Sequence, residues 1–215
     1  MNAEPNLAPP GAGLPKVELF VARIGFAFSR AISSRESVNA RFQRERETIA
    51  RLVKSLDADL ASQRVLIARP RGLEDSSRYW SLWMTLEHLR MVHHGITRTI
   101  QALAAGIAPK GRASTAAVKP GPDVNATVVE EYEKSCDRLL VTAKEIDDLR
   151  TNVRYAHPWF GALDAAGWHA LSASHLGIHR VQIERIAEQL RTAARSGKPV
   201  DSTGRLGFTL SARPS

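Results

Sequence analysis

Two histidines, His175 and His179, have a residue type and a spacing that could bind a metal ion. Four residues is just over one helical turn, so in a helix both side chains lie on one face and can contact one ion. They fall on the apolar stripe of a segment, from Asp164 to Leu190, with the periodicity of an amphipathic helix. The apolar members of that stripe are Trp168, Leu171, Ile178, Ile186 and Leu190. Both imidazoles are therefore expected to face the core.

A third histidine, His88, lies on the apolar stripe of a second predicted helix, which runs from residue 77 or 81 to residue 104. Residues three, four and seven positions away share its helical face. These residues are Met84, Met91, Val92 and Gly95. His93 and His94 project from other faces of this helix, and we expect them, like His169, at the surface or at an edge, with the alternative that His93 or His94 reaches a neighbouring helix. The three candidate metal ligands are thus His88, His175 and His179.

Three neutral imidazoles that leave a fourth position open are typical of catalytic zinc sites, whereas structural sites use four protein ligands. Zinc or nickel suits imidazole better than magnesium or calcium, which prefer oxygen. Such a metal lowers the pKa of a bound water or thiol toward about 7 and so supplies a nucleophile at neutral pH. The alternative is that the three histidines are core residues whose hydrogen bonds are satisfied by one another and by backbone groups.

Two further residues are candidates for moving protons at this site. His157 precedes the fourth predicted helix and would lie at the mouth of the site, and Gln182 lies about one turn beyond His179. Each also has a simpler interpretation. His157 would brace the loop before the helix, and Gln182 would orient a metal ligand through a hydrogen bond.

Four long helices must position these residues, and we place them in one domain over residues 33–195. The first begins near Ser33, because Ser33 and Glu36 fit a capping box. The third spans about residues 123–150. The segment 106–122 is longer than the roughly two to eight residues that usually join antiparallel helices. We therefore predict a crossover between the second and third helices, which would be parallel.

The two ends of the chain lie outside this domain. Residues 1–15 are rich in proline and glycine and are predicted to form a mobile arm, and residues 196–215 a tail. Residues 16–32 are apolar, but they are too few and too charged to span a bilayer. We expect an added helix that packs on the domain or on a second copy of the chain in a homodimer. The alternative is contact with a membrane surface through Phe20, Phe26 and Phe28.

Composition narrows the classes of partner. The chain has 215 residues, a formal net charge of +8 and one cysteine, Cys136, which can form no intramolecular disulfide and fits a reducing cytoplasm. The basic residues are spread over all segments without a block of like charges, so no specific nucleic-acid partner is predicted. Contact of these basic residues with a membrane surface or a nucleic acid stays open as an alternative.

Two segments together resemble the DinB/YfiT-like superfamily of metal-binding four-helix bundles, namely WSLWMTLEHL (residues 80–89) and HPWFGALDAAGWHALSASHLGIHRVQI (residues 157–183). The resemblance implies an all-α, DinB-like four-helix bundle in which His88, His175 and His179 bind a divalent metal. It implies a metal-dependent hydrolase, or a transferase or isomerase that uses a low-molecular-weight thiol as cofactor, acting on a small-molecule substrate. No residue here matches a thiol-cofactor pocket, and a non-catalytic bundle for binding or scaffolding is the alternative.

Overall fold

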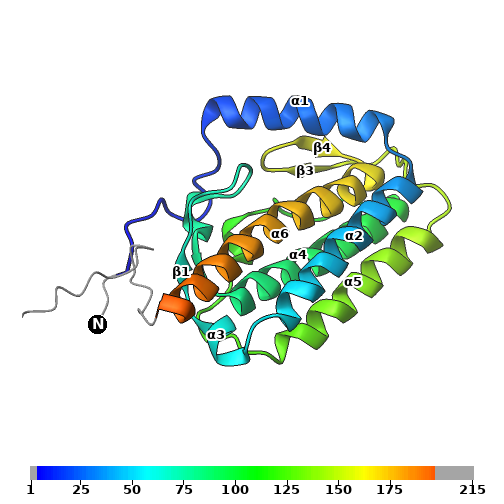
Figure 1. Ribbon diagram of the computed structural model, residues 1–215. Coiled ribbons are helices and arrows are strands. Elements are labelled where there is room, and N and C mark those ends of the chain that lie inside the picture. The colour runs from blue at the N-terminus through cyan, green and yellow to red at the C-terminus, as the bar shows by residue number, and fades with distance from the viewer. Residues whose placement is uncertain (1–3, 197–215) are drawn as a thin grey trace, which may run out of the picture.

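The structure is a computed structural model that describes residues 4–196 (Figure 1). Within this range the long helices are α1 (Lys16–Ile32), α2 (Arg35–Lys54), α4 (Leu82–Ala104), α5 (Val128–Glu145) and α6 (Ala165–Ser196). The short elements are α3 (Ala58–Ser62), η1 (Asp75–Ser77), η2 (Ala116–Val118), β1 (Val65–Leu66), β2 (Tyr79–Trp80), β3 (Tyr155–His157) and β4 (Gly161–Leu163). Two antiparallel ribbons, β1–β2 and β3–β4, supply the strands. The predicted all-α bundle is confirmed, and α2, α4, α5 and α6 form it.

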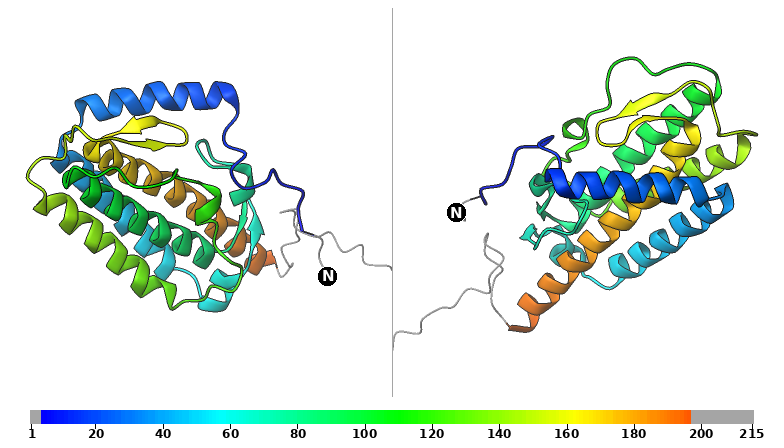
Figure 2. Two further views of the ribbon diagram at one scale, coloured as in Figure 1. Left: turned by 180° about the vertical axis from the view of Figure 1, so that it is seen from behind. Right: turned by 90° about the horizontal axis from the view of Figure 1, so that it is seen from above.

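The bundle consists of two pairs of parallel helices. Along α4 and α5, hydrogen-bonded partners rise in number together, as parallel helices require: His93 with Ser135, then Gln101 with Thr142. The same holds along α2 and α6: Asn39 with His169, then Glu45 with Arg180. Between α4 and α5 the chain runs back along the bundle, as Figures 1 and 2 show, so the predicted crossover is confirmed.

The structure corrects two predicted helix boundaries. The cap of α2 is Ser34, whose hydroxyl accepts a hydrogen bond from the Ser37 N–H at 3.2 Å, and not Ser33, whose own N–H closes the end of α1. The third bundle helix, α5, is shorter than predicted because Ile146 adopts an extended backbone (φ −82°, ψ 121°). The following chain still reaches the core through Leu149, which is buried. The prediction placed the end of this helix too late because the apolar Leu149, which lies beyond the helix, was counted as part of its apolar stripe.

The core lies between the four bundle helices and contains side chains from each of them. Its fully buried members include Phe42, Ile49, Leu86, Leu89, Tyr132, Leu139, Leu176, Ile183 and Ile186. Burial of an aliphatic or aromatic side chain of this size stabilises a fold by about 1.5–3 kcal/mol. The core therefore holds the helices that carry the histidines in fixed relative positions.

Two histidines that were predicted at the surface are instead buried. His93 has no exposed surface, and its Nδ1 lies 3.2 Å from the Ser135 hydroxyl. His169 is 2% exposed, and its Nε2 lies 2.8 Å from Asn39 Oδ1. Each finds a polar partner on a neighbouring helix, which offsets the cost of burying a ring nitrogen. His94 is half-buried, as expected for an edge position.

The N-terminal helix α1 lies across the outside of the bundle, beside the β3–β4 ribbon (Figure 1). Polar side chains of α1 connect it to the rest of the domain. Glu18 pairs with Arg69 and accepts the Gly72 N–H at 2.7 Å, and Arg23 donates to the Trp159 carbonyl at 2.6 Å. The Phe26 ring packs 4.5 Å from Phe160, centroid to centroid. Through these contacts α1 packs on its own domain.

The preceding segment, residues 4–15, also contacts the domain, although residues 1–15 were predicted to form a mobile arm. The Ala8 N–H donates to Asp75 at 2.9 Å, and the N–H groups of Gly11 and Gly13 donate to Glu74. Prolines and glycines prevent a helix here. The N–H groups of Ala8, Gly11 and Gly13 are therefore not used within a helix and can donate to the two carboxylates. The predicted tail lies outside the described residues except for its first residue. Within residues 4–196 no helix has the length and apolarity needed to cross a membrane.

Candidate metal centre

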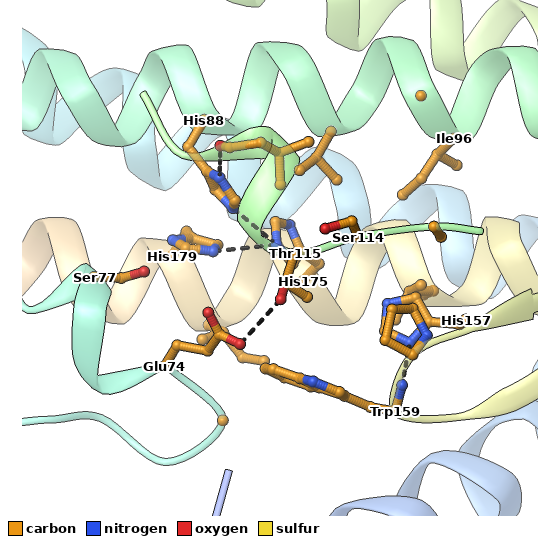
Figure 3. Close-up of a pocket in the computed structure, with 18 of the residues that line it drawn as sticks. Glu74, Ser77, His88, Ile96, Ser114, Thr115, His157, Trp159, His175 and His179 are labelled. Carbon is orange, nitrogen blue, oxygen red and sulfur yellow. Dashed lines mark hydrogen bonds between the residues drawn. The ribbon is translucent and has the colours of Figure 1, made fainter. Parts of the chain in front are cut away.

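The structure brings His88, His175 and His179 together between α4 and α6 (Figure 3). His175 Nε2 lies 3.2 Å from His88 Nε2 and 3.1 Å from His179 Nε2. One ring nitrogen from each residue lies within 4.8 Å of the other two. Such spacing allows three nitrogens to bind a single ion after small side-chain adjustments, because a zinc–nitrogen bond is about 2.0–2.1 Å long.

The crossover segment fixes the orientation of His88. Ser81 caps the N-terminus of helix α4, its hydroxyl accepting the Met84 N–H at 3.1 Å, and His88 follows about two turns later. His88 Nδ1 lies 2.8 Å from the carbonyl oxygen of Val118, which can only accept a hydrogen bond. The proton of the neutral ring is therefore on Nδ1. This leaves the Nε2 lone pair directed toward the other two histidines.

Gln182 fixes the orientation of His179 in the same way. The Gln182 amide nitrogen donates to the Ser77 carbonyl at 2.7 Å, which determines which end of the amide carries the oxygen. That oxygen lies 2.6 Å from His179 Nδ1 and accepts its proton. Hydrogen bonds of this kind set the tautomer of metal-binding histidines. His179 Nε2 is thus also a lone pair that faces the cluster.

The three rings cannot satisfy one another's hydrogen-bonding capacity. His175 is neutral and carries one N–H, so it can donate to His88 or to His179 but not to both. Its Nδ1 is buried and has no hydrogen-bond partner among residues 4–196. The alternative of self-satisfied core histidines therefore does not fit this geometry. A divalent cation fits the donor set, because it would accept the lone pairs of all three rings.

Burial keeps the three imidazoles in the form that binds metals. It lowers the pKa of His88 to about 4, although the hydrogen bond to Val118 acts in the opposite direction. It also lowers the pKa values of His175 and His179 well below the ordinary range, and the neighbouring imidazoles add to this effect. All three rings are therefore neutral at pH 7, as metal binding requires.

A cavity of about 370 Å³ adjoins the histidine cluster, which is a typical size for a small-molecule site. Helices α4 and α6, the β3–β4 ribbon, the crossover and the N-terminal segment all contribute to its wall. Trp80 packs against the cluster, with its ring 5.2 Å from His88 and stacked 6.3 Å from His179. The candidate metal site thus lies at the side of a chamber that is lined in part by aromatic side chains.

His157 lies in the wall of this cavity and belongs to the β3–β4 ribbon rather than to a helix. Its Nδ1 accepts the Trp159 N–H at 3.1 Å, and its ring packs 5.2 Å from Phe160 and 5.4 Å from Trp168. Burial lowers the pKa of His157 to about 4, so the ring is neutral at pH 7. These contacts match its interpretation as a brace for the loop before α6.

Sequence reasoning missed several residues that shape the site. The Val118 and Ser77 carbonyls orient two of the imidazoles, and Trp80 covers them. Glu74 joins the N-terminal segment to the crossover, because it also accepts the Thr115 hydroxyl at 3.0 Å. Backbone carbonyls carry no signal in residue type. Trp80 was visible inside the segment WSLWMTLEHL, eight positions before His88, but only the fold places its ring on the cluster.

Comparisons with known proteins agree with this description. A family model described as the DinB superfamily matches residues 41–183, which is more than half of the chain. Among solved structures, the four-helix bundle protein TT2238 has a similar fold, with a TM-score of 0.52 and 18% sequence identity. That similarity covers 70% of this chain and 98% of the other. No curated protein sequence matches significantly. The family match, over a fold and a histidine cluster that agree with it, shows that this protein belongs to the DinB superfamily.

Proposed function

We propose that this protein is a divalent-metal-dependent enzyme that acts on a small molecule, with His88, His175 and His179 as the metal ligands. The observation that carries the proposal is the convergence of three imidazole nitrogens beside a cavity, with two rings held as Nδ1–H tautomers. The donor set favours zinc or nickel. The reaction class is hydrolysis, or transfer or isomerisation that uses a low-molecular-weight thiol as cofactor.

The chain's own residues prepare the site for such a reaction. A metal bound there would supply Lewis acidity and lower the pKa of a water or thiol toward about 7. Gln182 is fully buried and bonded on both sides, so we assign it the positioning of His179 rather than proton transfer. His157 stays the candidate for moving a proton, because it is neutral at pH 7 and lies in the cavity wall.

Metal content tests the proposal directly. Untagged protein purified without chelator should hold about one zinc or nickel per chain by elemental mass spectrometry. The His175→Ala, His179→Ala double variant should hold none. His94→Ala is the matched control, because His94 lies on α4 outside the cluster, and this variant should keep the metal. Failure of the wild type to hold metal after reconstitution with zinc or nickel would reject the proposal.

The non-catalytic alternative makes a different prediction. A binding or scaffold protein of this fold would hold the metal, or lack it, without turnover of ester, amide or thiol-transfer substrates. Its biological output would also survive the triple change His88→Ala, His175→Ala and His179→Ala. Retention of that output would favour the scaffold function, whereas its loss together with the metal favours the enzyme.

We propose in addition that two copies of the chain associate through the outward face of α1. That face consists of large apolar side chains that are 56–77% exposed, namely Val17, Phe20, Val21, Ile24, Phe28 and Ile32. Their three- and four-residue spacing is the pattern by which two helices pack along a seam. Gly25 lies beside the face, and a Cβ there would meet no atom within 4 Å, so a second helix can approach closely.

A second copy suits this face better than a membrane surface does. Helices that lie on membranes present lysines and arginines to lipid phosphates. In α1, Arg30 pairs with Asp164 and the exposed Arg23 donates to the Trp159 carbonyl, which leaves Lys16 as the exposed basic side chain of this helix without such a contact among the described residues. Phe26, one of the three phenylalanines considered for a membrane contact, is buried against Phe160. A two-fold dimer would cover the same apolar face on both copies.

Two expectations about the surroundings of the protein stay proposals. The cytoplasmic location rests on the single cysteine, Cys136, which is free and buried, and whose pKa is raised by burial to about 12. A thiol in that state is unreactive at neutral pH. Contact of arginines with phosphates would have to use arginines that are not already paired with a carboxylate. Within residues 4–196 the paired ones are Arg30, Arg46, Arg64, Arg69, Arg78, Arg90 and Arg180.

A further inference from the structure

The cavity beside the histidine cluster is lined mainly by carbon. Aromatic and aliphatic side chains form most of its wall, including Trp80, Met91, Ile96, Trp159, Phe160 and Leu171. Several of them come from segments far apart in the sequence, and Figure 3 shows Ile96 and Trp159 at the end of the chamber away from His179. A ligand in this chamber gains free energy chiefly by removing apolar surface from water, at about 25 cal/mol per Å².

Most of the polar groups in the wall already have partners within the protein. Glu74 accepts the Gly13 N–H and the Thr115 hydroxyl, which occupies the one carboxylate of the lining. The Thr99 hydroxyl donates to the Gly95 carbonyl at 2.9 Å, and the Ser174 hydroxyl to the Ala170 carbonyl at 3.2 Å. These groups serve the fold. Besides the imidazoles, the polar groups that remain include the Ser114 hydroxyl and the Lys119 ammonium, which lie on exposed residues of the crossover at the open side of the cavity.

Two buried ring nitrogens of the wall are left without a partner among residues 4–196, namely His175 Nδ1 within the cluster and the Trp80 indole nitrogen, which always carries a proton. Trp80 is 3% exposed, and its indole N–H has no hydrogen-bond acceptor among residues 4–196. A buried donor without an acceptor costs roughly 1–3 kcal/mol, which a ligand that supplies the acceptor recovers. Trp80 lines the cavity and packs against His88 and His179. The acceptor is therefore expected at the end of the ligand that lies nearest to the metal ligands.

We propose that the chamber binds an uncharged, mostly apolar small molecule with an aromatic or branched aliphatic body and one oxygen acceptor near Trp80. That the oxygen lies next to a metal rests on the proposed function. That the body of the ligand is apolar rests on the cavity wall alone. The chamber disfavours a sugar-bearing thiol, because each hydroxyl that enters it without a partner costs roughly 1–3 kcal/mol. The side chains of the cavity wall, rather than the three histidines, therefore determine which class of substrate binds.

Gly95 allows the chamber to be narrowed without touching the cluster. It lies seven residues after His88 on the same face of α4, and it lines the cavity. Gly95 is exposed, a Cβ built there meets no atom within 4 Å, and its backbone is helical, so Gly95→Leu narrows the chamber from its open side without strain. Gly121→Leu is the matched control, because Gly121 has the same open surroundings but does not line the cavity.

The experiment is isothermal titration calorimetry of metal-free protein with two probes of similar heavy-atom count, 2-acetylnaphthalene and methyl glucoside. We expect the ketone to bind and the glucoside not to bind. Gly95→Leu should weaken ketone binding about tenfold or more, since the apolar surface that the ketone buries is lost. Gly121→Leu should bind as the wild type does. Thermal unfolding of Gly95→Leu at or above the wild-type temperature would show that the variant folds.

Trp80→Phe separates the oxygen contact from the apolar contact. It should weaken binding of the ketone by about three- to tenfold and leave 2-ethylnaphthalene, which lacks the oxygen, nearly unchanged. Absence of ketone binding to the wild type, tighter binding of the glucoside, or equal ketone binding to Gly95→Leu would overturn the proposal. The titrations use metal-free protein, so they test the binding of an apolar ligand separately from the binding of a metal. If the protein binds the ketone but holds no metal, the proposed function is refuted and the inference about the ligand stands.

Discussion

Acidification should destabilise the metal-free protein, and His169 offers a way to measure the effect of one histidine. His169 is 2% exposed, and burial lowers its pKa in the folded protein to about 4, with a smaller contribution from Arg35. In the unfolded chain a histidine has a pKa of about 6.5. Between these values the unfolded chain binds a proton that the folded chain does not bind. The free energy of unfolding therefore falls as the pH falls.

The size of the effect follows from the two pKa values. The contribution of neutral His169 is fully present above about pH 6.5 and is lost as the pH falls toward 4. At pH 5 the loss is about 1.5 pH units at 1.4 kcal/mol each, or about 2 kcal/mol. His93, whose pKa is lowered by burial to about 3, contributes a loss of the same size at that pH. The other buried histidines act in the same direction.

The substitution His169→Gln isolates one such contribution. Glutamine cannot titrate, but its amide can still donate to Asn39, as His169 does at 2.8 Å. Urea unfolding at pH 8 and pH 5, with chelator present, should show a pH-dependent loss of stability about 2 kcal/mol smaller in this variant than in the wild type. The same change at His94, which is less buried, should have a smaller effect. An unchanged pH dependence in His169→Gln would refute the assigned pKa.

Three further outcomes are expected. Gln182→Leu removes the hydrogen-bond acceptor of His179 and should weaken zinc binding about 10–100-fold, as measured by competition with a chromophoric chelator. Unchanged zinc affinity would show that this hydrogen bond does not help His179 to bind the metal. Zinc at a hundred times its dissociation constant should add about 2.7 kcal/mol to the stability of the wild type and nothing to His179→Ala, as urea unfolding would detect. The double variant Ile24→Asp, Phe28→Asp should sediment as a monomer, whereas the wild type should sediment as a dimer. If the wild type is instead a monomer that binds anionic vesicles, the face of α1 contacts a membrane.

The sequence identified the residues whose position depends on helical periodicity alone. His88, His175 and His179 fall on apolar stripes of α4 and α6, and antiparallel packing of these helices brings the three together. The crossover was also predictable, because the length of segment 106–122 excludes a tight hairpin of helices. Local sequence and loop length therefore determined much of the site.

Features that depend on contacts between elements were not predictable in this way. His93 and His169 lie off the main stripes of their helices, and only the positions of Ser135 and Asn39 on neighbouring helices make their burial favourable. The helix predicted from residue 33 begins one residue later, because Ser33 and Ser34 carry the same hydroxyl and the sequence cannot distinguish them. The β3–β4 ribbon was not predicted, because a strand of three residues is too short to show the alternation of apolar and polar side chains by which strands are recognised.

The parallel pairing of α4 with α5 and of α2 with α6 has a consequence for the rate of folding. Partners that hydrogen-bond in these pairs are far apart along the chain: Asn39 and His169 are separated by 130 residues, and His93 and Ser135 by 42. The cluster contact between His88 and His175, from α4 to α6, spans 87 residues. Helical proteins normally fold fast because their contacts are local, and closing long loops costs entropy before any contact rewards it. We expect this bundle to fold slowly for an all-helical protein. The histidine cluster should assemble only once the far ends of the chain have met, so a metal would stabilise the finished fold rather than nucleate it.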